Sequence, residues 1–522
     1  MDSGLKLHYV EAICGSGKTH QMVKRIIDSE YPYYIIATPT TRLSQSICKE
    51  FRSQGYGGNV IIINSDKATD SVYREVTIAL TNALASSDKH ILIITHNTLM
   101  RIASRDKHQL LAKFNIFIDE LPEEYCSPKT ITVHNWNKND CEWKPWINLD
   151  ESVQSIQEVT LSDGCHEHVN RFLQNAQDYD ETDIYKKDGI YDFLDHLSNS
   201  GRCAYARSNG SHKTFHYSNA LALLRVIRQS KSVTILANNV VESLSVSTLS
   251  KLDNVKMIKL DWGLPTHYKC GDKVTIQVML PEEYIYTKYL GQKKSDPNSD
   301  YSSDIKKDIF EAVKHELNKN DLFKQEETAL VIANKKDHKN FSGFNPITNS
   351  VHGLNCWDDR NVAIYLSTCR LKPDEENTLK YIEDTHHITG LRDAAQTQRC
   401  YEACLQSLFR ISIRRSFREE ISHITFFVPS YDHAEYVSRY TPNCTIKLDH
   451  AIEIKKQISN DAKNLESVIK VLTMKKSQKG IKRSEGRLPI EEICKINEIG
   501  YGTYRSSIVR HRTELQQRGL MH

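Results

Sequence analysis

Short apolar runs recur in the first part of the chain, and patterns of helical period separate them. The runs occupy residues 5–11, 33–37, 60–63, 91–94 and 116–118. Continuous apolar runs of this length that alternate with helices indicate a parallel sheet covered on both faces. The ligands of such sheets gather where the strands end. The pattern therefore predicts an α/β domain with its site at the carboxyl edge of the sheet.

A second set of runs follows after a long interruption, at residues 232–237, 274–280, 328–333, 361–366 and 424–428. The last of these runs is expected to close a second parallel sheet. We therefore expect an α/β protein with two sheet domains, an insertion and a small helical C-terminal domain. The expected segments are 1–122 with 231–265 for the first domain, 123–230 for the insertion, 266–432 for the second domain, 433–487 for a helical, basic linker and 488–522 for a two-helix tail.

The pattern of the insertion predicts both strands and helices, and it contains no recognisable functional motif. It holds three of the five tryptophans, a strand-like run at 131–133 and helical patterns at 169–176 and 190–197.

Composition excludes several classes of protein. The 522 residues carry a net charge of only +3, which by itself implies no polyanionic partner. The 13 cysteines are scattered without paired C-x-x-C motifs, so they indicate neither a zinc site nor a disulfide framework. No apolar run approaches the roughly 18 residues of a membrane span. We expect reduced thiols and a cytoplasmic location, in a bacterium or the host of a virus, without a membrane partner.

The segment 12–19, with the sequence AICGSGKT, is typical of a loop that binds phosphate. It follows the first strand-like run and precedes a helical pattern at 21–28, which is the context that such a loop requires. Gly15, Ser16 and Gly17 form a turn in which successive N–H groups can face an anion, and the helix dipole adds to this attraction. A chance Gly-Lys turn is the competing interpretation.

Four side chains would carry the chemistry at this loop. Lys18 would reach the β- and γ-phosphates of ATP, and the Thr19 hydroxyl would complete the shell of Mg²⁺. Asp119 and Glu120 end the run at 116–118. Asp119 is placed to hold the metal ion, and Glu120 is placed to orient or deprotonate the attacking water. The sequence therefore predicts a catalytic site for ATP hydrolysis.

In their order along the chain, these motifs resemble those of superfamily 2 helicases of the DEAD/DEAH type. A helicase of a phage or a mobile element is one candidate within this group. AICGSGKT matches motif I, TPTTRL at 38–43 resembles motif Ia, THNTL at 95–99 resembles motif Ib, and IDELP at 118–122 lies in the place of motif II. The Ser/Thr-Ala-Thr of motif III is absent, and Asn238-Asn239 stands there instead. The resemblance implies two RecA-like domains with ATP between them.

The resemblance also implies a groove for nucleic acid, lined by Thr38, Thr40, Arg42, Thr95 and His96. Hydroxyl and N–H groups of such residues would contact phosphates without selecting a base sequence. The alternative is an ordinary strand-to-helix turn in which threonine caps the helix.

The helical pattern at 401–415 carries Gln406, Arg410 and Arg414 at intervals of four, which would place them on one helix face. This pattern resembles motif VI, which implies that Gln406 contacts nucleotide and that arginines reach the γ-phosphate across the cleft. The family spacing from glutamine is four and seven. Position seven is an isoleucine here, so the second arginine is either Arg414 or Arg415. A basic surface helix is the competing account.

The C-terminal tail combines positive charge with two helical patterns. Residues 471–522 hold eleven Lys and Arg against five Glu and no Asp, a balance of 11 − 5 = +6. Helical patterns at 488–499 and 504–517 flank a glycine turn, and helix–turn–helix units look like this. Arg505, Arg510 and Arg512 would lie on the second helix and contact DNA, whereas protein contact or helical packing is the alternative. Six apolar positions could supply a small core: Ile490, Ile493, Ile496, Ile499, Ile508 and Leu515.

Together these features predict an ATP hydrolase that couples the closing of two domains to the movement of nucleic acid, with DNA favoured over RNA. An ATP-driven clamp that binds nucleic acid without unwinding it is the alternative. A packaging motor would need an acidic nuclease domain, and the tail is too short and too basic for one. Protein partners are expected through the insertion or the tail.

Overall fold

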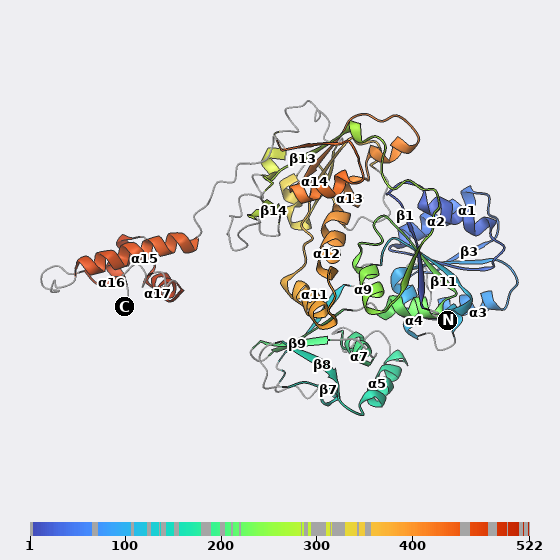
Figure 1. Ribbon diagram of the computed structural model, residues 1–522, viewed down its shortest axis with the longest axis horizontal. Coiled ribbons are helices and arrows are strands. Elements are labelled where there is room, and N and C mark those ends of the chain that lie inside the picture. Colours follow the sequence, from blue (N-terminus) through green and yellow to red (C-terminus); the bar gives the residue numbers. More distant parts are fainter. Residues whose placement is uncertain are drawn as a thin grey trace. The chain divides into compact units, whose positions relative to one another are not determined.

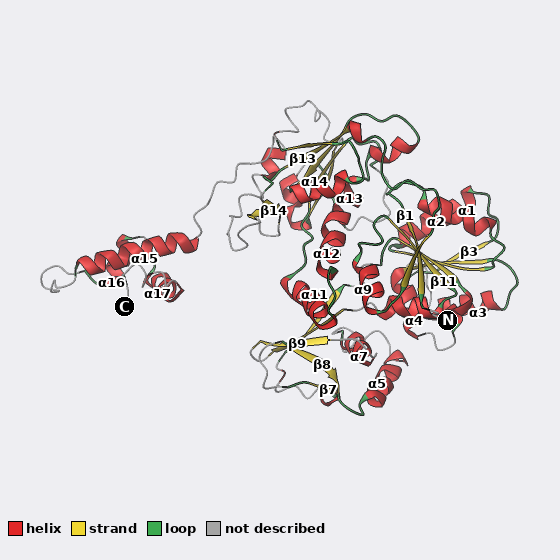
Figure 2. Cartoon of the chain, in the orientation of Figure 1, coloured by secondary structure: helices red, strands yellow, loops and turns green. Residues whose placement is uncertain are grey.

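The chain forms two compact units, Met1–Val278 with Leu317–Asp449 and Met279–Glu316 with His450–His522. In this computed structural model (Figures 1 and 2), the described residues are 4–64, 71–105, 109–122, 127–134, 136, 142–150, 156–178, 189–198, 204–209, 212–218, 221–282, 284–286, 291–293, 309–313, 315, 329–341, 344–349, 357–448, 460–478, 488–497, 499–510, 515 and 520.

The first domain is built on a seven-stranded sheet in the order β12-β1-β11-β5-β2-β4-β3. All neighbouring strands of this sheet run parallel. Its strands are β1 (Lys6–Glu11), β2 (Tyr33–Thr38), β3 (Asn59–Ile62), β4 (His90–Thr95), β5 (Asn115–Asp119), β11 (Ser232–Ala237) and β12 (Lys256–Lys259). The parallel α/β architecture predicted for this region is confirmed.

Helices cover both faces of this sheet because side chains alternate along each strand. In β4, Leu92 and Ile94 belong to the core on one face, whereas Ile91 and Ile93 belong to the core on the other. The first face packs on α3 (Val72–Leu84), α4 (His96–Arg105), α8 (Leu221–Gln229) and α9 (Leu244–Leu252), and the second on α1 (Lys18–Asp28) and α2 (Thr41–Ser53). Strands buried on both sides explain why the sequence shows continuous apolar runs.

The order of the strands positions the later site. β11 comes after the insertion in sequence, yet it pairs with β1 on one side and β5 on the other. The residues that follow these three strands therefore meet at one edge of the sheet. They are the phosphate loop after β1, Asp119 at the end of β5, and Asn238 after β11.

The described residues of the insertion form an antiparallel sheet in the order β6-β10-β9-β8-β7, accompanied by two helices. Its elements are β6 (Pro128–Val133), β7 (Ile147–Asn148), β8 (Gln157–Leu161), α5 (His166–Asp178), α7 (Ile190–Ser198), β9 (Ala204–Asn209) and β10 (His212–Ser218). Trp136, Trp143 and Phe215 pack edge to face within its core. The predicted strand and both predicted helices are present.

The second domain contains a five-stranded parallel sheet in the order β16-β17-β18-β13-β19. Its strands are β13 (Val274–Val278), β16 (Ala329–Ala333), β17 (Val362–Leu366), β18 (Ile424–Val428) and β19 (Thr445–Lys447). The prediction that residues 424–428 close the sheet is wrong, because β19 pairs with β13 beyond them. The sheet therefore extends past residue 432, which the sequence analysis took as the end of this domain.

Two helices of the second domain, α11 (Pro373–His386) and α12 (Leu391–Gln396), follow β17 in sequence. Helix α11 packs on β10 and lies beside β9 in Figure 1. The Tyr205 hydroxyl on β9 donates to the Tyr381 carbonyl at 3.1 Å and lies 2.6 Å from the Thr385 hydroxyl. His216 on β10 lies 3.1 Å from the hydroxyl of Thr378. The insertion of one domain is thus bound to a helix of the other.

The C-terminal unit contains a small helical core. Its helices are α15 (Asn460–Ser477), α16 (Ile490–Ile496) and α17 (Tyr501–Arg510). Of the six apolar positions predicted for this core, Ile493, Ile499 and Leu515 are buried in it. Ile490 and Ile508 pack against it. Ile496 is 55% exposed, so its prediction is wrong. The long helix α15 supplies Val468 and Val471 in addition.

Among the described residues, every helix is too short or too polar to cross a bilayer.

Candidate active site

The phosphate loop joins β1 to α1 in a conformation that glycine favours. Gly15 has φ +75° and Gly17 has φ +92°, the left-handed region in which a Cβ is strained. Within the described structure, no side chain caps the N-terminus of α1, whose first turn lacks acidic residues. The hydroxyl of Ser16 is buried and has no hydrogen-bond partner among described atoms. An anion would satisfy these N–H and O–H donors.

Lys18 and Thr19 open α1 and face opposite parts of the site. The ammonium of Lys18 donates to the carbonyls of Ala12 at 2.6 Å and Ile13 at 3.1 Å, so it lies folded over its own loop. The hydroxyl of Thr19 donates to Oδ2 of Asp119 at 3.3 Å. The loop and the end of β5 are therefore in direct contact, although 100 residues separate the two side chains in sequence.

Asp119 is buried at the end of β5, and burial raises the pKa of its carboxyl to about 7. The negative charge of Glu120 raises this pKa further, whereas Lys18 and the hydrogen bond from Thr19 oppose the shift. Glu120 itself has φ +67°, which turns the chain sharply after the strand. A carboxylate pair with one buried member suits a site that is completed by a cation.

Residues of the second domain complete a cleft of about 400 Å³ around the phosphate loop. Its lining includes all the residues predicted for catalysis: Lys18, Asp119, Glu120, Arg410 and Arg414. Gly15, Gly17, Thr19 and Gln406 also line it. Residues far apart in sequence thus meet in one site, as the motif order predicts.

The predicted helix over 401–415 is wrong in its second half. A π-helical turn at Thr397–Glu402 leads into α13 (Ala403–Leu408), which ends at Leu408, and a 3₁₀ turn follows at Ser412–Phe417. Gln406 lies on the helix, and Arg410 lies in the turn after it, only 5% exposed. The three side chains thus reach the cleft from separate elements and do not share a helix face.

Arg414 lies against the phosphate loop. Its Cγ is 3.0 Å from the position that a Cβ on Gly15 would occupy, and its Nε donates to the Phe409 carbonyl. Arg415 also lines the cleft, but it forms an ion pair with Glu419. Of the two candidates for the second arginine, Arg414 is the one in contact with the loop.

Four of the five first-domain residues predicted for a nucleic-acid groove are buried or form local hydrogen bonds. Thr38 is buried, and its hydroxyl donates to the Thr40 carbonyl at 3.0 Å. Thr40 caps α2 through the N–H of Leu43, and Thr95 accepts from the N–H of Thr98. These contacts match the capping alternative.

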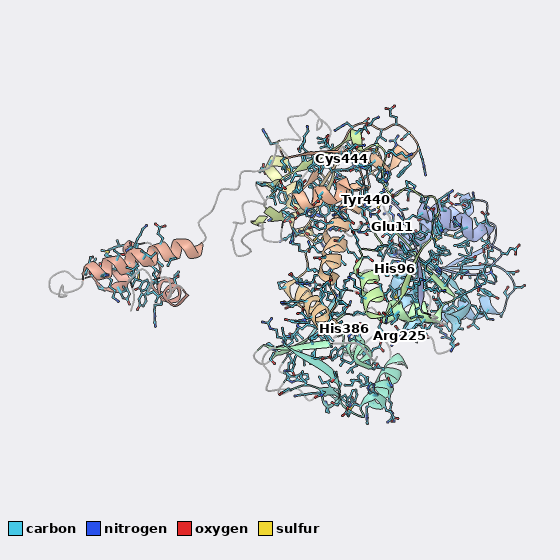
Figure 3. All side chains as sticks on the ribbon, viewed as in Figure 1. Glu11, His96, Arg225, His386, Tyr440 and Cys444 are labelled. Atoms are coloured by element: carbon cyan, nitrogen blue, oxygen red, sulfur yellow. The ribbon has the colours of Figure 1, made fainter. Side chains whose placement is uncertain are left out.

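His96, labelled in Figure 3, is buried, and its Nε2 lies 3.0 Å from the carbonyl of Asp119. Arg42 is exposed on α2. In the C-terminal unit, Arg505 is exposed on α17, which also contains Arg510 as its last residue. Arg512 lies outside the described residues.

Sequence reasoning missed a polar cluster beside the cleft. Asn238 donates to both oxygens of the buried Glu402, at 3.2 and 3.0 Å, and Tyr436 on α14 (Tyr431–Ser438) donates to the same carboxylate at 2.9 Å. The Asn-Asn pair in the place of motif III was a signal for this cluster. Glu402, near the start of an apparently regular helical pattern, offered none.

Similarity to known proteins is found among solved structures. No family model matches the sequence, and no curated protein matches it. Among solved structures, Xpd4 of S. tokodaii is similar at 10% identity and a TM-score of 0.41, over 85% of this chain and 96% of that one. S. cerevisiae Dbp5 bound to RNA and ADP BeF3 is similar at 10% identity and a TM-score of 0.35, over 86% of each chain. The helicase MrfA bound to DNA and AMPPNP is similar at 12% identity and a TM-score of 0.32, over 95% of this chain and 55% of that one.

These structures are what the chain is similar to, at identities of 10–12%. The chemistry of the site rests on the residues described above.

Proposed function

We propose that this protein is a nucleic-acid-dependent ATPase of the helicase or translocase type. One observation carries the proposal: Lys18, Asp119 and Arg410 line a single cleft, although the first and last are separated by most of the chain. A phosphate loop, a buried carboxylate and an arginine from a second domain are the parts that hydrolysis of a nucleoside triphosphate needs.

The residues divide the work as follows. Lys18 leaves its loop carbonyls to bind the β- and γ-phosphates, while Ser16 and the N–H groups around Gly15 and Gly17 bind the phosphate oxygens. Glu120 orients the attacking water and accepts its proton. Thr19 and Asp119 would hold Mg²⁺, which supplies neutralisation of charge on the phosphates when bound.

Arg410 belongs to the second domain, so it makes hydrolysis depend on contact between the two domains. A guanidinium placed beside the γ-phosphate neutralises the charge that develops in the transition state. Gln406 beside it would contact the same phosphate or the attacking water. Each turnover would therefore change how the domains meet, and nucleic acid bound to both would be moved or released.

For nucleic acid, the exposed Arg42 and Arg505 are the predicted contacts with the clearest access to solvent. Their guanidinium groups would bind phosphates. The other four predicted residues of the first domain would then stabilise the strand ends near such contacts: Thr38, Thr40, Thr95 and His96. We retain DNA as the preferred partner.

The contact between the insertion and α11 favours a second candidate, an ATP-driven clamp without unwinding activity. Tyr205 binds the backbone of Tyr381 and the side chain of Thr385 across this contact. Such a hydrogen-bonded contact, located away from the cleft, would limit how far the two domains separate.

The ATPase rate, measured with single-stranded DNA, duplex DNA and RNA in parallel, tests the proposal. We expect stimulation, largest with single-stranded DNA, and the absence of turnover with all three would refute an ATPase. Strand displacement on a 3′-tailed duplex then separates the two candidates. Hydrolysis without displacement would favour the clamp.

A further inference from the structure

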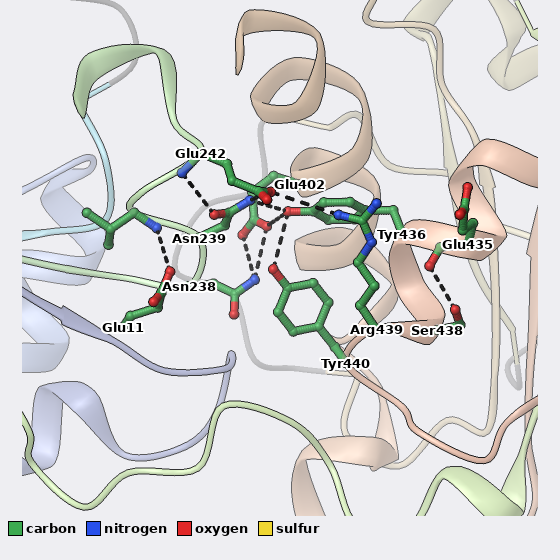
Figure 4. Close-up of polar contacts among 11 residues, drawn as sticks. Glu11, Asn238, Asn239, Glu242, Glu402, Glu435, Tyr436, Ser438, Arg439 and Tyr440 are labelled. Carbon is green, nitrogen blue, oxygen red and sulfur yellow. Dashed lines mark hydrogen bonds and ion pairs between the residues drawn. The ribbon is translucent and has the colours of Figure 1, made fainter. Parts of the chain in front are cut away.

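Glu402 is a buried carboxylate at which both sheet domains meet. It is 2% exposed and ends the π-helical turn Thr397–Glu402. Its oxygens accept four hydrogen bonds from three side chains. Asn238 provides two of them from the first domain, and Gln406 and Tyr436 provide one each from the second (Figure 4 shows the contacts of Asn238 and Tyr436).

The backbone around Glu402 is unusual for a residue that only fills a core. The π turn interrupts the helical stretch between α12 and α13, and single π turns within helices occur often at functional sites. It places Glu402 one turn before Gln406, whose Nε2 donates to Oε1 of Glu402 at 3.0 Å.

The carboxylate fixes which way two amides point. An ionised carboxylate only accepts hydrogen bonds, so the NH₂ groups of Gln406 and Asn238 must face it. The carbonyl oxygens of both amides then point away from Glu402. Because both residues line the cleft, these oxygens are available to accept a hydrogen bond from a water molecule or a ligand hydroxyl there.

The same cluster interacts electrostatically with the phosphate loop and forms hydrogen bonds between the two domains. Burial raises the pKa of Glu402, whereas the hydrogen bonds from Gln406, Asn238 and Tyr436 and the charge of Lys18 act in the opposite direction. The next residue, Asn239, donates to the Tyr436 hydroxyl at 2.9 Å, so two consecutive residues after β11 are bound to the second domain. Separation of the domains would break the contacts of Asn238 and Asn239, whereas the hydrogen bonds of Gln406 and Tyr436 to Glu402 lie within the second domain.

We propose that Glu402 is a positioning residue that holds Gln406 in the orientation needed for hydrolysis and adds Asn238 to the same arrangement only while the two domains are in contact. This inference rests on the proposed ATPase function. It assigns to the Asn238–Glu402 pair the link between the cleft and the domain interface.

The variant Glu402→Gln tests the inference in the full-length chain with ATP and Mg²⁺. Its amide must turn one N–H toward a donor, which would displace Gln406 or Asn238. We expect kcat to fall between about tenfold and a hundredfold, as for a catalytic group moved by an ångström, while KM for ATP changes less than about threefold. The matched control is Glu242→Gln, a 57% exposed carboxylate that binds Asn239 nearby and should leave kcat unchanged.

The double variant Asn238→Asp with Glu402→Gln exchanges the amide and the carboxylate across the contact. The amide introduced at position 402 can donate to the carboxylate introduced at position 238 and to the Tyr436 hydroxyl while still accepting from Gln406. We therefore expect the double variant to recover most of the lost kcat, whereas Asn238→Asp alone, with two facing carboxylates, loses more than Glu402→Gln.

Four results decide the matter. A kcat of Glu402→Gln equal to that of wild type would overturn the inference, and so would a loss that matches only the unfolded fraction seen by thermal denaturation. Should Glu402→Gln fold poorly, Tyr436→Phe removes one donor and should still lower kcat with KM unchanged; a normal kcat there would equally count against the inference. A wild-type protein without ATPase activity would remove the proposed function and this inference together.

Discussion

Arg414 of the second domain lies against Gly15 of the phosphate loop, with its Cγ 3.0 Å from the place of a Cβ at that glycine. The loop therefore needs glycine for two reasons at one position, its φ of +75° and the close approach of the arginine. The contact also couples the two domains, because a movement of the 3₁₀ turn that carries Arg414 would change the packing against the loop.

The variant Gly15→Ala tests this coupling. A methyl group here would strain the backbone by about 1 kcal/mol and would push Arg414 away. We expect ATP hydrolysis to fall at least about tenfold, measured as kcat at saturating ATP. Gly55→Ala is the matched control, because Gly55 has φ +78° with no described atom within 4 Å and lies outside the cleft. An equal effect of both substitutions on kcat would show that backbone strain alone is responsible.

Lys18→Ala should abolish ATP turnover with little effect on the fold. The ammonium donates to two carbonyls of its own loop, so its loss removes hydrogen bonds within that loop. ATPase assays and thermal denaturation would show the two effects separately. Lys24→Ala, at an exposed position on the same helix, serves as control and should turn over ATP normally. Wild-type turnover in Lys18→Ala would defeat the assignment of the loop.

Arg410→Ala should leave ATP binding nearly intact and lower hydrolysis about 10³-fold or more, as expected of an arginine supplied by a second domain. Binding is measured by titration with a non-hydrolysable ATP analogue, and hydrolysis by phosphate release. Arg228→Ala, an exposed arginine on α8, is the control. Loss of binding in proportion to turnover would instead assign Arg410 a structural role.

The strands were predictable because burial on both faces leaves continuous apolar runs. Residues 424–428, for example, match β18 at both ends. The site residues at the strand ends were equally predictable from the sequence, because the carboxyl ends of parallel strands lie together at one edge of the sheet. The short strand β19, with its sequence Thr-Ile-Lys, carries too little apolar pattern to be recognised.

The error at 401–415 has a physical cause. From Phe409 to Ile413 the apolar residues alternate, and Phe409, Ile411 and Ile413 are all buried in the core of the second domain. Alternation is the period of an extended chain, and Ile411 does have extended backbone angles, φ −94° and ψ −168°. The four-residue spacing of the polar side chains concealed this second period. The hydrogen bonds of Glu402 come from residues remote in sequence, so no local pattern could have revealed them.

Asp119 makes the free energy of unfolding depend on pH in a way that an aspartate with an ordinary pKa would not. Its pKa is raised to about 7 in the folded protein, compared with about 3.9 for an unfolded chain. Between these values the folded state binds more protons than the unfolded state, so the free energy of unfolding decreases as pH rises from about 4 to about 7, by at most about 1.4 kcal/mol per pH unit from this group.

Asp119→Asn should remove this contribution, so that the variant is more stable than wild type near pH 8 and differs less from it near pH 4. Chemical denaturation across this range, without nucleotide, measures the effect. The control Asp88→Asn, at an exposed position before β4, should reproduce the wild-type profile. The variant should also fail to hydrolyse ATP, because an amide cannot supply the negative charge that holds the cation. Coincident pH profiles for wild type and Asp119→Asn would mean that the pKa of this carboxyl is the same in the folded and the unfolded protein, which would contradict a raised pKa at this site.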